Sequence, residues 1–232
     1  MSAPRPHPIA PYFLEQEYLI MLRSFLLPLL ALLLGFNAPA ALAADTPPDV
    51  LARTTTQEVI TILKQDKELQ RGDLTRVHQL VEAKILPNFD FNRMTQLALG
   101  RHWPRATARQ KQSLVTEFRN LLVRTYSSSL TAFTDQVIEF KPLAMKPDDT
   151  DVTVRSEIRQ PGGQPIPINY SFYKTAFGWK VYDVTIDGVS LITNYRSSFA
   201  STIRQSGIDG LIKTLAAQSA RGTVAPANGN GS

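Results

Sequence analysis

Side chains that could perform catalysis are few in this chain, and their spacing fits no catalytic motif. Gly188-Val189-Ser190-Leu191-Ile192 begins like the G-x-S-x-G nucleophile elbow, but isoleucine stands where the motif needs its second glycine. No histidine follows Ser190 to serve as its base. Ser190 is therefore predicted to be a helix N-cap after a glycine turn.

Metal ligands are also poorly arranged. His78 and His102 are far apart in the sequence, and the chain has no cysteine. Asp148, Asp149 and Asp151 follow a proline and lack the glycine and glutamate spacing of a calcium loop, so they are predicted to form a solvated turn. We expect no metal, no cofactor and no catalytic residue, although paired carboxylates for glycoside chemistry stay open.

The N-terminus has the pattern of a secretory signal peptide. Met21-Leu22-Arg23 precedes an apolar run at residues 25–36, and Ala41-Leu42-Ala43 follows it as an A-x-A cleavage pattern. The run of about 12 residues is shorter than the ~20 that a membrane-spanning helix needs. We therefore predict a leader and signal peptide at residues 1–43, a true start at Met21, and export across the membrane with cleavage near Ala43.

The formal net charge of +5 and the pI near 9.5 suggest an anionic partner. The chain has no run of five or six Lys/Arg residues and no aromatic-basic RNA motif, so nucleic acid is not expected. A membrane surface or an anionic head group fits the charge better.

Apolar residues recur at helical spacing in the first half of the exported chain. Helices are predicted over residues 50–69, over 74–85 with Asp73 as N-cap, and over 90–99 with Asp90 as N-cap. The longest helix is predicted over 107–133, and Thr107 and Gln110 form a capping box at its start.

From residue 136 the apolar period changes to two, which predicts four strands joined by short turns. A helix at 190–206, a break at Gly207 and a short helix at 208–215 follow them. The predicted fold class is α+β: N-terminal helices, a four-stranded antiparallel sheet and C-terminal helices. The pattern leaves open whether an apolar cavity or a filled core lies between sheet and helices. One domain is predicted at 44–220, and a disordered tail at 221–232.

The apolar pattern alone leaves three functions open. A cavity behind the sheet would suit a lipid carrier, and a cone-shaped α+β enzyme or small apolar-ligand binder would need a carboxylate or histidine with a perturbed pKa in its pocket. An interaction module would have a fully packed interior.

An ordered set of motifs favours the first function. The set comprises Ile85-Leu86-Pro87 to Phe91, Leu99-Gly100 to Trp103, Gln110 to Phe118 and Tyr126, Trp179 to Val184, and Asp187 to Phe199. In this order the chain resembles the MlaC, or toluene-tolerance, family of periplasmic phospholipid-binding proteins, from about residue 69 to 215. The resemblance implies a monomeric carrier that holds acyl chains between sheet and helices and maintains outer-membrane lipid asymmetry. It also implies two partners, an outer-membrane lipoprotein complex and an inner-membrane ABC transporter complex with a lipid-binding domain.

The expected lining of the cavity combines in-phase strand positions with one face of the long helix. The strand positions are Ile138, Phe140, Val152, Val154, Ile158, Ile168, Tyr170 and Phe172. The helix positions are Phe118, Leu122 and Tyr126, and the resemblance adds Val189 and Tyr195. Head-group or partner contacts are expected from Arg155, Lys174 and Arg196.

Overall fold

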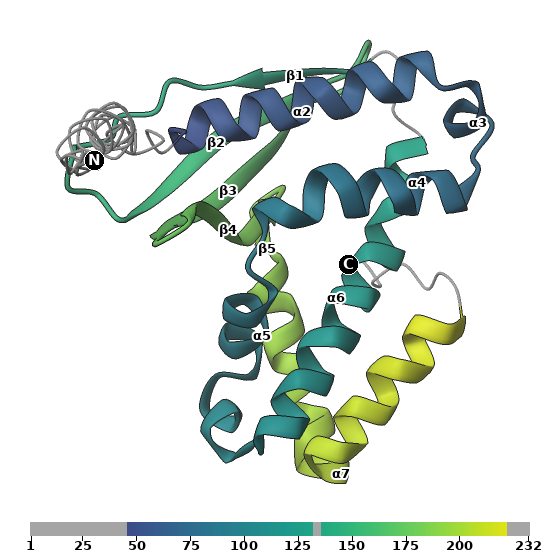
Figure 1. The fold of residues 1–232 in the computed structure, drawn as a ribbon, viewed down its shortest axis with the longest axis vertical. Helices are drawn as coiled ribbons and strands as arrows, with labels where there is room; N and C mark the ends of the chain where they lie inside the picture. The colour runs from purple at the N-terminus through teal and green to yellow at the C-terminus, as the bar shows by residue number, and fades with distance from the viewer. Residues whose placement is uncertain (1–45, 132–135, 222–232) are drawn as a thin grey trace, which may run out of the picture. The chain divides into compact units, whose positions relative to one another are not determined.

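The computed structural model describes residues 46–131 and 136–221 (Figure 1). The predicted leader and signal peptide at 1–43 lie outside the described residues, and so does the predicted tail beyond residue 221. No helix within the two described ranges combines the length and the apolar composition needed to cross a membrane.

Three helices open the described chain: α2 (Pro48–Gln65), α3 (Lys67–Gln70) and α4 (Leu74–Leu80). The single helix expected over 50–69 is interrupted at Asp66, because this side chain accepts hydrogen bonds from the backbone N–H groups of Glu68 and Leu69 and so starts a new helix. The predicted N-cap of α4 is confirmed: Asp73 accepts from the N–H of Thr75 at 2.9 Å.

The helix expected over 74–85 changes its winding before its end. It widens into the π-helical turn η1 (Val81–Ile85) and then tightens into the 3₁₀ turn η2 (Leu86–Asn88). Pro87 lacks a backbone N–H and so cannot continue the α-helical hydrogen bonding. The two turns redirect the chain toward the sheet, where residue 89 pairs with β4.

The middle helices are α5 (Phe91–Leu99), the 3₁₀ turn η3 (Gly100–Arg105) and α6 (Ala108–Thr131). Asp90 caps α5 as predicted, accepting from the N–H of Arg93 at 2.9 Å. The capping box is also confirmed, because Gln110 donates its N–H to Thr107 Oγ1 and Thr107 donates its N–H to Gln110 Oε1.

The sheet contains the four predicted strands and one more. In chain order they are β1 (Val137–Phe140), β2 (Asp151–Arg159), β3 (Ile166–Thr175), β4 (Gly178–Ile186) and β5 (Val189–Ser190), and all neighbours are antiparallel. The short β5 was not expected. It forms because Asp187 and Gly188 both have positive φ, 49° and 79°, which turns the chain back onto β4.

The C-terminal helix α7 (Leu191–Arg221) begins at the predicted cap, where Ser190 Oγ accepts from the N–H of Thr193 at 3.0 Å. Gly207 interrupts it, as predicted, with a φ of 72° that disfavours residues with a Cβ. The second half of α7 then returns beside α6 (Figure 1).

Three separate groups of buried side chains hold these elements together. The first joins α5, α6 and α7 around Phe118 and Phe199, the second joins the sheet to α2 around Val154 and Phe172, and the third joins α2 to α4 around Val77. The space where the three groups meet is not fully packed, and it contains the candidate site.

Candidate functional site

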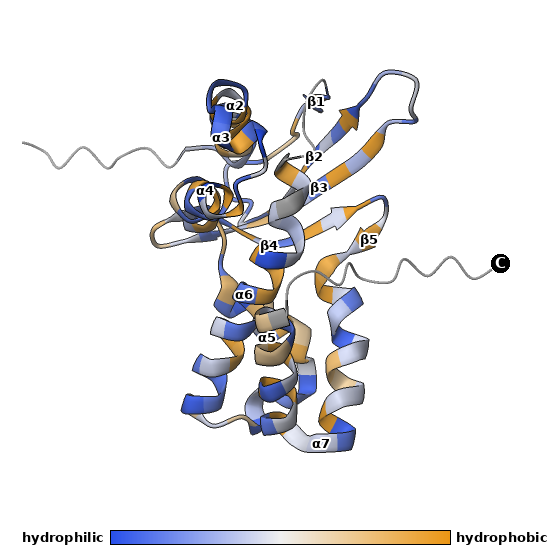
Figure 2. Cartoon of the chain, turned by 90° about the vertical axis from the view of Figure 1, so that its right-hand side faces the viewer, coloured by the Kyte–Doolittle hydropathy of each residue, from blue (hydrophilic) through white to orange (hydrophobic). Residues whose placement is uncertain are grey.

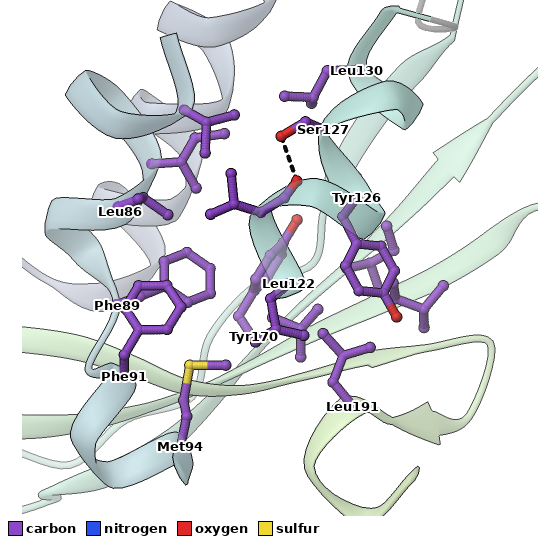
Figure 3. Close-up of a pocket in the computed structure, with 16 residues that line it drawn as sticks. Leu86, Phe89, Phe91, Met94, Leu122, Tyr126, Ser127, Leu130, Tyr170 and Leu191 are labelled. Carbon is purple, nitrogen blue, oxygen red and sulfur yellow. Dashed lines mark hydrogen bonds between the residues drawn. The ribbon is translucent and has the colours of Figure 1, made fainter. Parts of the chain in front are cut away.

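A cavity of about 280 Å³ opens between the sheet and the helices (Figure 3). In this view Phe89, Phe91 and Met94 lie on one side of it, and Tyr126 and Leu191 on the other. The lining draws on all three buried groups: Val81, Ile85, Leu86, Phe89, Phe91, Met94, Leu122, Val123, Tyr126, Ser127, Leu130, Ile168, Tyr170, Val184, Ile186 and Leu191.

A second cavity of about 210 Å³ lies against α2. Four residues line both cavities: Ile85, Phe89, Leu130 and Tyr170. The remainder of the second lining is Leu51, Ala52, Thr55, Thr56, Val59, Ile60, Asn88, Ile138, Phe172 and Val181. The two cavities are therefore neighbours that share one wall, built from η1, Phe89 just after η2, α6 and β3.

The polar atoms of the first cavity carry no formal charge at neutral pH. Ser127 donates its hydroxyl hydrogen bond to the carbonyl oxygen of Val123 in its own helix. Burial, with a smaller contribution from Tyr195, raises the pKa of Tyr126 to about 12, and burial also raises the pKa of Tyr170. Both phenols are therefore neutral, and this lining suits hydrocarbon better than a charged ligand.

No carboxylate, histidine or other charged side chain lines either cavity among the described residues. General acid–base chemistry in these cavities would need such a group. Nor does the described part of the chain bring three potential metal ligands together. Asp149 accepts a hydrogen bond from the backbone N–H of Lys146 at 2.8 Å, as expected of the predicted acidic turn.

Six of the expected lining residues lie at the cavities. Leu122, Tyr126, Ile168 and Tyr170 line the first cavity, and Ile138, Tyr170 again and Phe172 line the second. The alternation in β3 brings three of them to one face, because residues two apart along a strand point the same way.

The other expected lining residues lie outside both cavities. Phe118, Val152 and Val154 are buried within packed groups. Phe140 stacks on Tyr170, and Tyr195 packs edge-on against Phe118 with ring centroids 5.1 Å apart. Ile158 is half-buried opposite Ile166 in the β2–β3 pairing, and Val189 is 57% exposed on β5.

The basic residues expected to contact a head group or partner also lie away from the linings. Arg155 is exposed on β2 and Lys174 is exposed near the end of β3. Arg196 is exposed on α7 and donates from Nε to the carbonyl oxygen of Leu97 at 3.1 Å.

The segment between Val81 and Met94 contributes much of the lining and was missing from the expected set. Phe89 lines both cavities and stacks on Phe91 with ring centroids 6.0 Å apart. The motif from Ile85 to Phe91 was the available signal, but irregular backbone gives no periodicity from which to deduce where a side chain points.

Comparisons with known proteins agree on one family. The family model described as MlaC protein matches residues 53–217. The intermembrane phospholipid transport system binding protein MlaC of Haemophilus influenzae is 25% identical over 200 residues, which cover 85% of this chain and 94% of the relative. A toluene tolerance protein of Pseudomonas putida is 28% identical over 188 residues, covering 81% of this chain and 86% of the relative.

A solved structure is also similar. It is the phospholipid-binding protein from Ralstonia solanacearum in complex with a phospholipid, which is 39% identical in sequence and superposes with a TM-score of 0.70. The match covers 76% of this chain and 98% of that chain.

Proposed function

The chain belongs to the MlaC family, and on this premise we propose that it carries a phospholipid between the outer and inner membranes, with the acyl chains in the two adjoining cavities. The observation that carries the assignment to this site is the uncharged, almost wholly apolar lining between β3–β4 and α6. The family consists of lipid carriers and not of enzymes.

The free energy of hydrocarbon transfer explains why a carrier is needed. Each methylene that leaves an apolar environment for water costs about 0.8 kcal/mol. Transfer of a phospholipid with about thirty methylenes from a bilayer into water would therefore cost on the order of 20 kcal/mol of free energy. A dry cavity lined by leucine, isoleucine and aromatic side chains removes most of this cost during transit.

Within the proposal, the acyl chains contact Leu122, Tyr126, Ile168 and Tyr170 in the first cavity, and Ile138 and Phe172 in the second. Phe89 separates the two spaces and contacts ligand on both sides. Phe118, Phe140, Val152, Val154, Ile158, Val189 and Tyr195 support this lining from behind or lie beyond it.

Export and partners complete the proposal. Because the family is periplasmic, we expect residues 1–43 to direct export and to be removed near Ala43. The carrier would then act as a monomer between an outer-membrane lipoprotein complex and an inner-membrane ABC transporter complex with a lipid-binding domain, maintaining outer-membrane lipid asymmetry. Arg155, Lys174 and Arg196 lie outside the linings, so we assign them to contacts with these partners or with the head group.

The test is to recover the exported protein from the bacterial periplasm without detergent and to extract it with organic solvent. Mass spectrometry of the extract should find phospholipid in near-stoichiometric amount. An extract that is free of phospholipid would contradict the proposal, because a carrier with this lining should not lose its ligand to water during purification.

A further inference from the structure

The positive charge of this protein is concentrated at one end of its helical part. Residues 100–113 and 203–213, here called the basic end, contain Arg101, Arg105, Arg109, Lys111, Arg204 and Lys213. Asp209 is their only carboxylate, so these two segments carry a formal charge of +5, equal to the charge of the whole chain. The remaining formal charges cancel.

The fold brings the two segments together. Asp209, just after the Gly207 break in α7, accepts a hydrogen bond from Gln110 Nε2 in the first turn of α6 at 2.8 Å. His102 in η3 is buried. Its pKa is lowered mainly by burial, and Arg101, Arg105 and Arg204 lie close enough to lower it further. Guanidinium groups from η3 and α7 therefore lie near one buried imidazole.

These cations are available to an external partner. Arg101, Arg105, Arg109 and Arg204 are exposed, and none of the six basic residues forms an ion pair with a carboxylate among the described residues. Lys111 makes a cation–π contact, with its Nζ 5.2 Å from the ring centroid of Trp103. Figure 2 shows hydrophilic residues around the end of the molecule where α7 turns.

We propose that the basic end is a docking surface for an anionic phospholipid membrane, separate from the lipid-binding cavities. Guanidinium groups form paired hydrogen bonds with phosphate, and basic residues near an anionic bilayer attract it over about a Debye length. This contact goes beyond the proposed carrier function, because it binds a surface and not the transported lipid.

The make-up of the surface favours a membrane over a protein partner. Stable protein interfaces centre on buried aromatic or aliphatic anchors. The large hydrophobic side chains that are exposed in the described part of the chain are Val50, Leu74, Val137, Met145, Phe177 and Val189. None of them belongs to the basic end, which offers charge without an apolar anchor.

The position of the surface also has a consequence for transport. Arg109 lies in the first turn of α6 and Leu122 lies thirteen residues later, which is about 20 Å along the helix axis. Docking through the basic end would hold the cavities away from the head groups. The lipid-loaded protein would then stay bound to the membrane surface without exchanging its ligand directly with the bilayer.

The experiment measures sedimentation of the exported protein with vesicles of phosphatidylcholine alone or with about 30% phosphatidylglycerol. We expect binding only to the anionic vesicles, with a loss as salt rises from about 25 to 300 mM. The variant Arg101→Glu/Arg105→Glu/Arg204→Glu should lose about tenfold or more of the partition coefficient, and the milder Arg101→Gln/Arg105→Gln/Arg204→Gln should lose a part of it.

The matched control is Lys64→Glu/Lys67→Glu/Lys146→Glu, which changes the net charge equally at exposed residues outside the basic end. It should keep binding within about twofold of the unaltered protein. An equal loss of vesicle binding in both triple-Glu variants would contradict the proposed docking surface. So would an unaltered protein that does not bind the anionic vesicles. Phospholipid bound in the cavities, measured in each protein preparation before vesicles are added, should be the same in all variants. Loss of vesicle binding is thereby distinguished from loss of the bound lipid.

Discussion

The backbone N–H of Asp90 donates a hydrogen bond to the carbonyl oxygen of Val181 at 2.9 Å, which joins the start of α5 to strand β4. The pairing places Phe89 alongside the sheet and between the two cavities. The hydroxyl of Tyr173 on β3 also donates to the Asp90 carboxylate. These two hydrogen bonds connect the start of α5 to the sheet beside the cavity.

A charge introduced into the first cavity should abolish lipid retention. Ile168 lines the cavity from β3, and Ile168→Lys would place an ammonium group among apolar side chains where no carboxylate can pair with it. We expect at least about a tenfold drop in phospholipid recovered per protein, measured by mass spectrometry after detergent-free purification.

The neighbouring Asn169→Lys is the matched control, since consecutive residues of a strand point to opposite faces. It adds the same charge to the same strand outside both linings. Circular dichroism of both variants checks folding. A folded Ile168→Lys protein with a full complement of lipid would show that the ligand does not occupy this cavity.

Truncation of Phe89 should be costly for stability. Phe89→Ala removes the ring that packs against two buried groups and separates the two cavities. Full core truncations of this kind cost about 3–5 kcal/mol, and a half-buried ring beside open space should cost about 2–3 kcal/mol. Urea denaturation gives the free energy of unfolding.

Phe177→Ala provides the comparison, because Phe177 is 92% exposed at the β3–β4 turn. We expect this second truncation to change the free energy of unfolding by less than about 0.5 kcal/mol. Equal effects of the two truncations would contradict the role given to Phe89.

Loss of the Asp90 carboxylate should destabilise the protein more than loss of the Asp73 carboxylate. Both residues cap a helix, and replacing either with alanine should cost about 1 kcal/mol. Asp90 also accepts the hydroxyl of Tyr173, so Asp90→Ala should cost about 1 kcal/mol more than Asp73→Ala. Tyr173→Phe should reproduce this additional loss. Identical costs for the two aspartates would refute a stabilising hydrogen bond between the Tyr173 hydroxyl and the Asp90 carboxylate.

Alkaline pH should weaken the fold through Tyr126. Its pKa of about 12 in the folded protein lies above the ordinary value of 10.0, since burial disfavours the phenolate. The folded state therefore binds this proton more tightly than the unfolded state, and the stabilisation is complete below pH 10 and is lost as the pH rises toward about 12.

Tyr126→Phe should lessen the fall in the free energy of unfolding over this alkaline range. Absorbance titration of the phenolate should show one fewer group titrating near pH 12. At neutral pH the variant should still retain lipid, because the ring stays in the lining. If Tyr126→Phe left the alkaline pH dependence of the free energy of unfolding unchanged, the pKa of Tyr126 would not be raised in the folded protein.

Local sequence signals predicted most of the fold. Asp73, Asp90, Ser190 and the pair Thr107 and Gln110 act as caps where expected, because capping depends on residues within one helical turn.

The alternation in β2 predicted the buried positions Val152 and Val154. In β3, Phe172 is buried as this pattern predicts, whereas Ile168 and Tyr170 are half-buried. The two-residue strand β5 is too short to show a period.

The lining of the cavity was less predictable. Alternation places Val154 and Tyr170 on the same face, yet Val154 is fully buried in a packed group and Tyr170 borders open space. The difference depends on what packs over each position, which is a property of the tertiary fold. Phe89 depends likewise on the long-range pairing with Val181.

The cavity between β3–β4 and α6 is the proposed site of the phospholipid acyl chains. The most direct test loads the protein with a phospholipid that carries a photoactivatable group at the end of one acyl chain, irradiates it, and identifies the labelled peptides by mass spectrometry. We expect labels on the segments at residues 81–94, 122–130 and 168–170, and loss of these labels in Ile168→Lys. Labels confined to the exposed surface, with these segments unmodified, would contradict the proposed site.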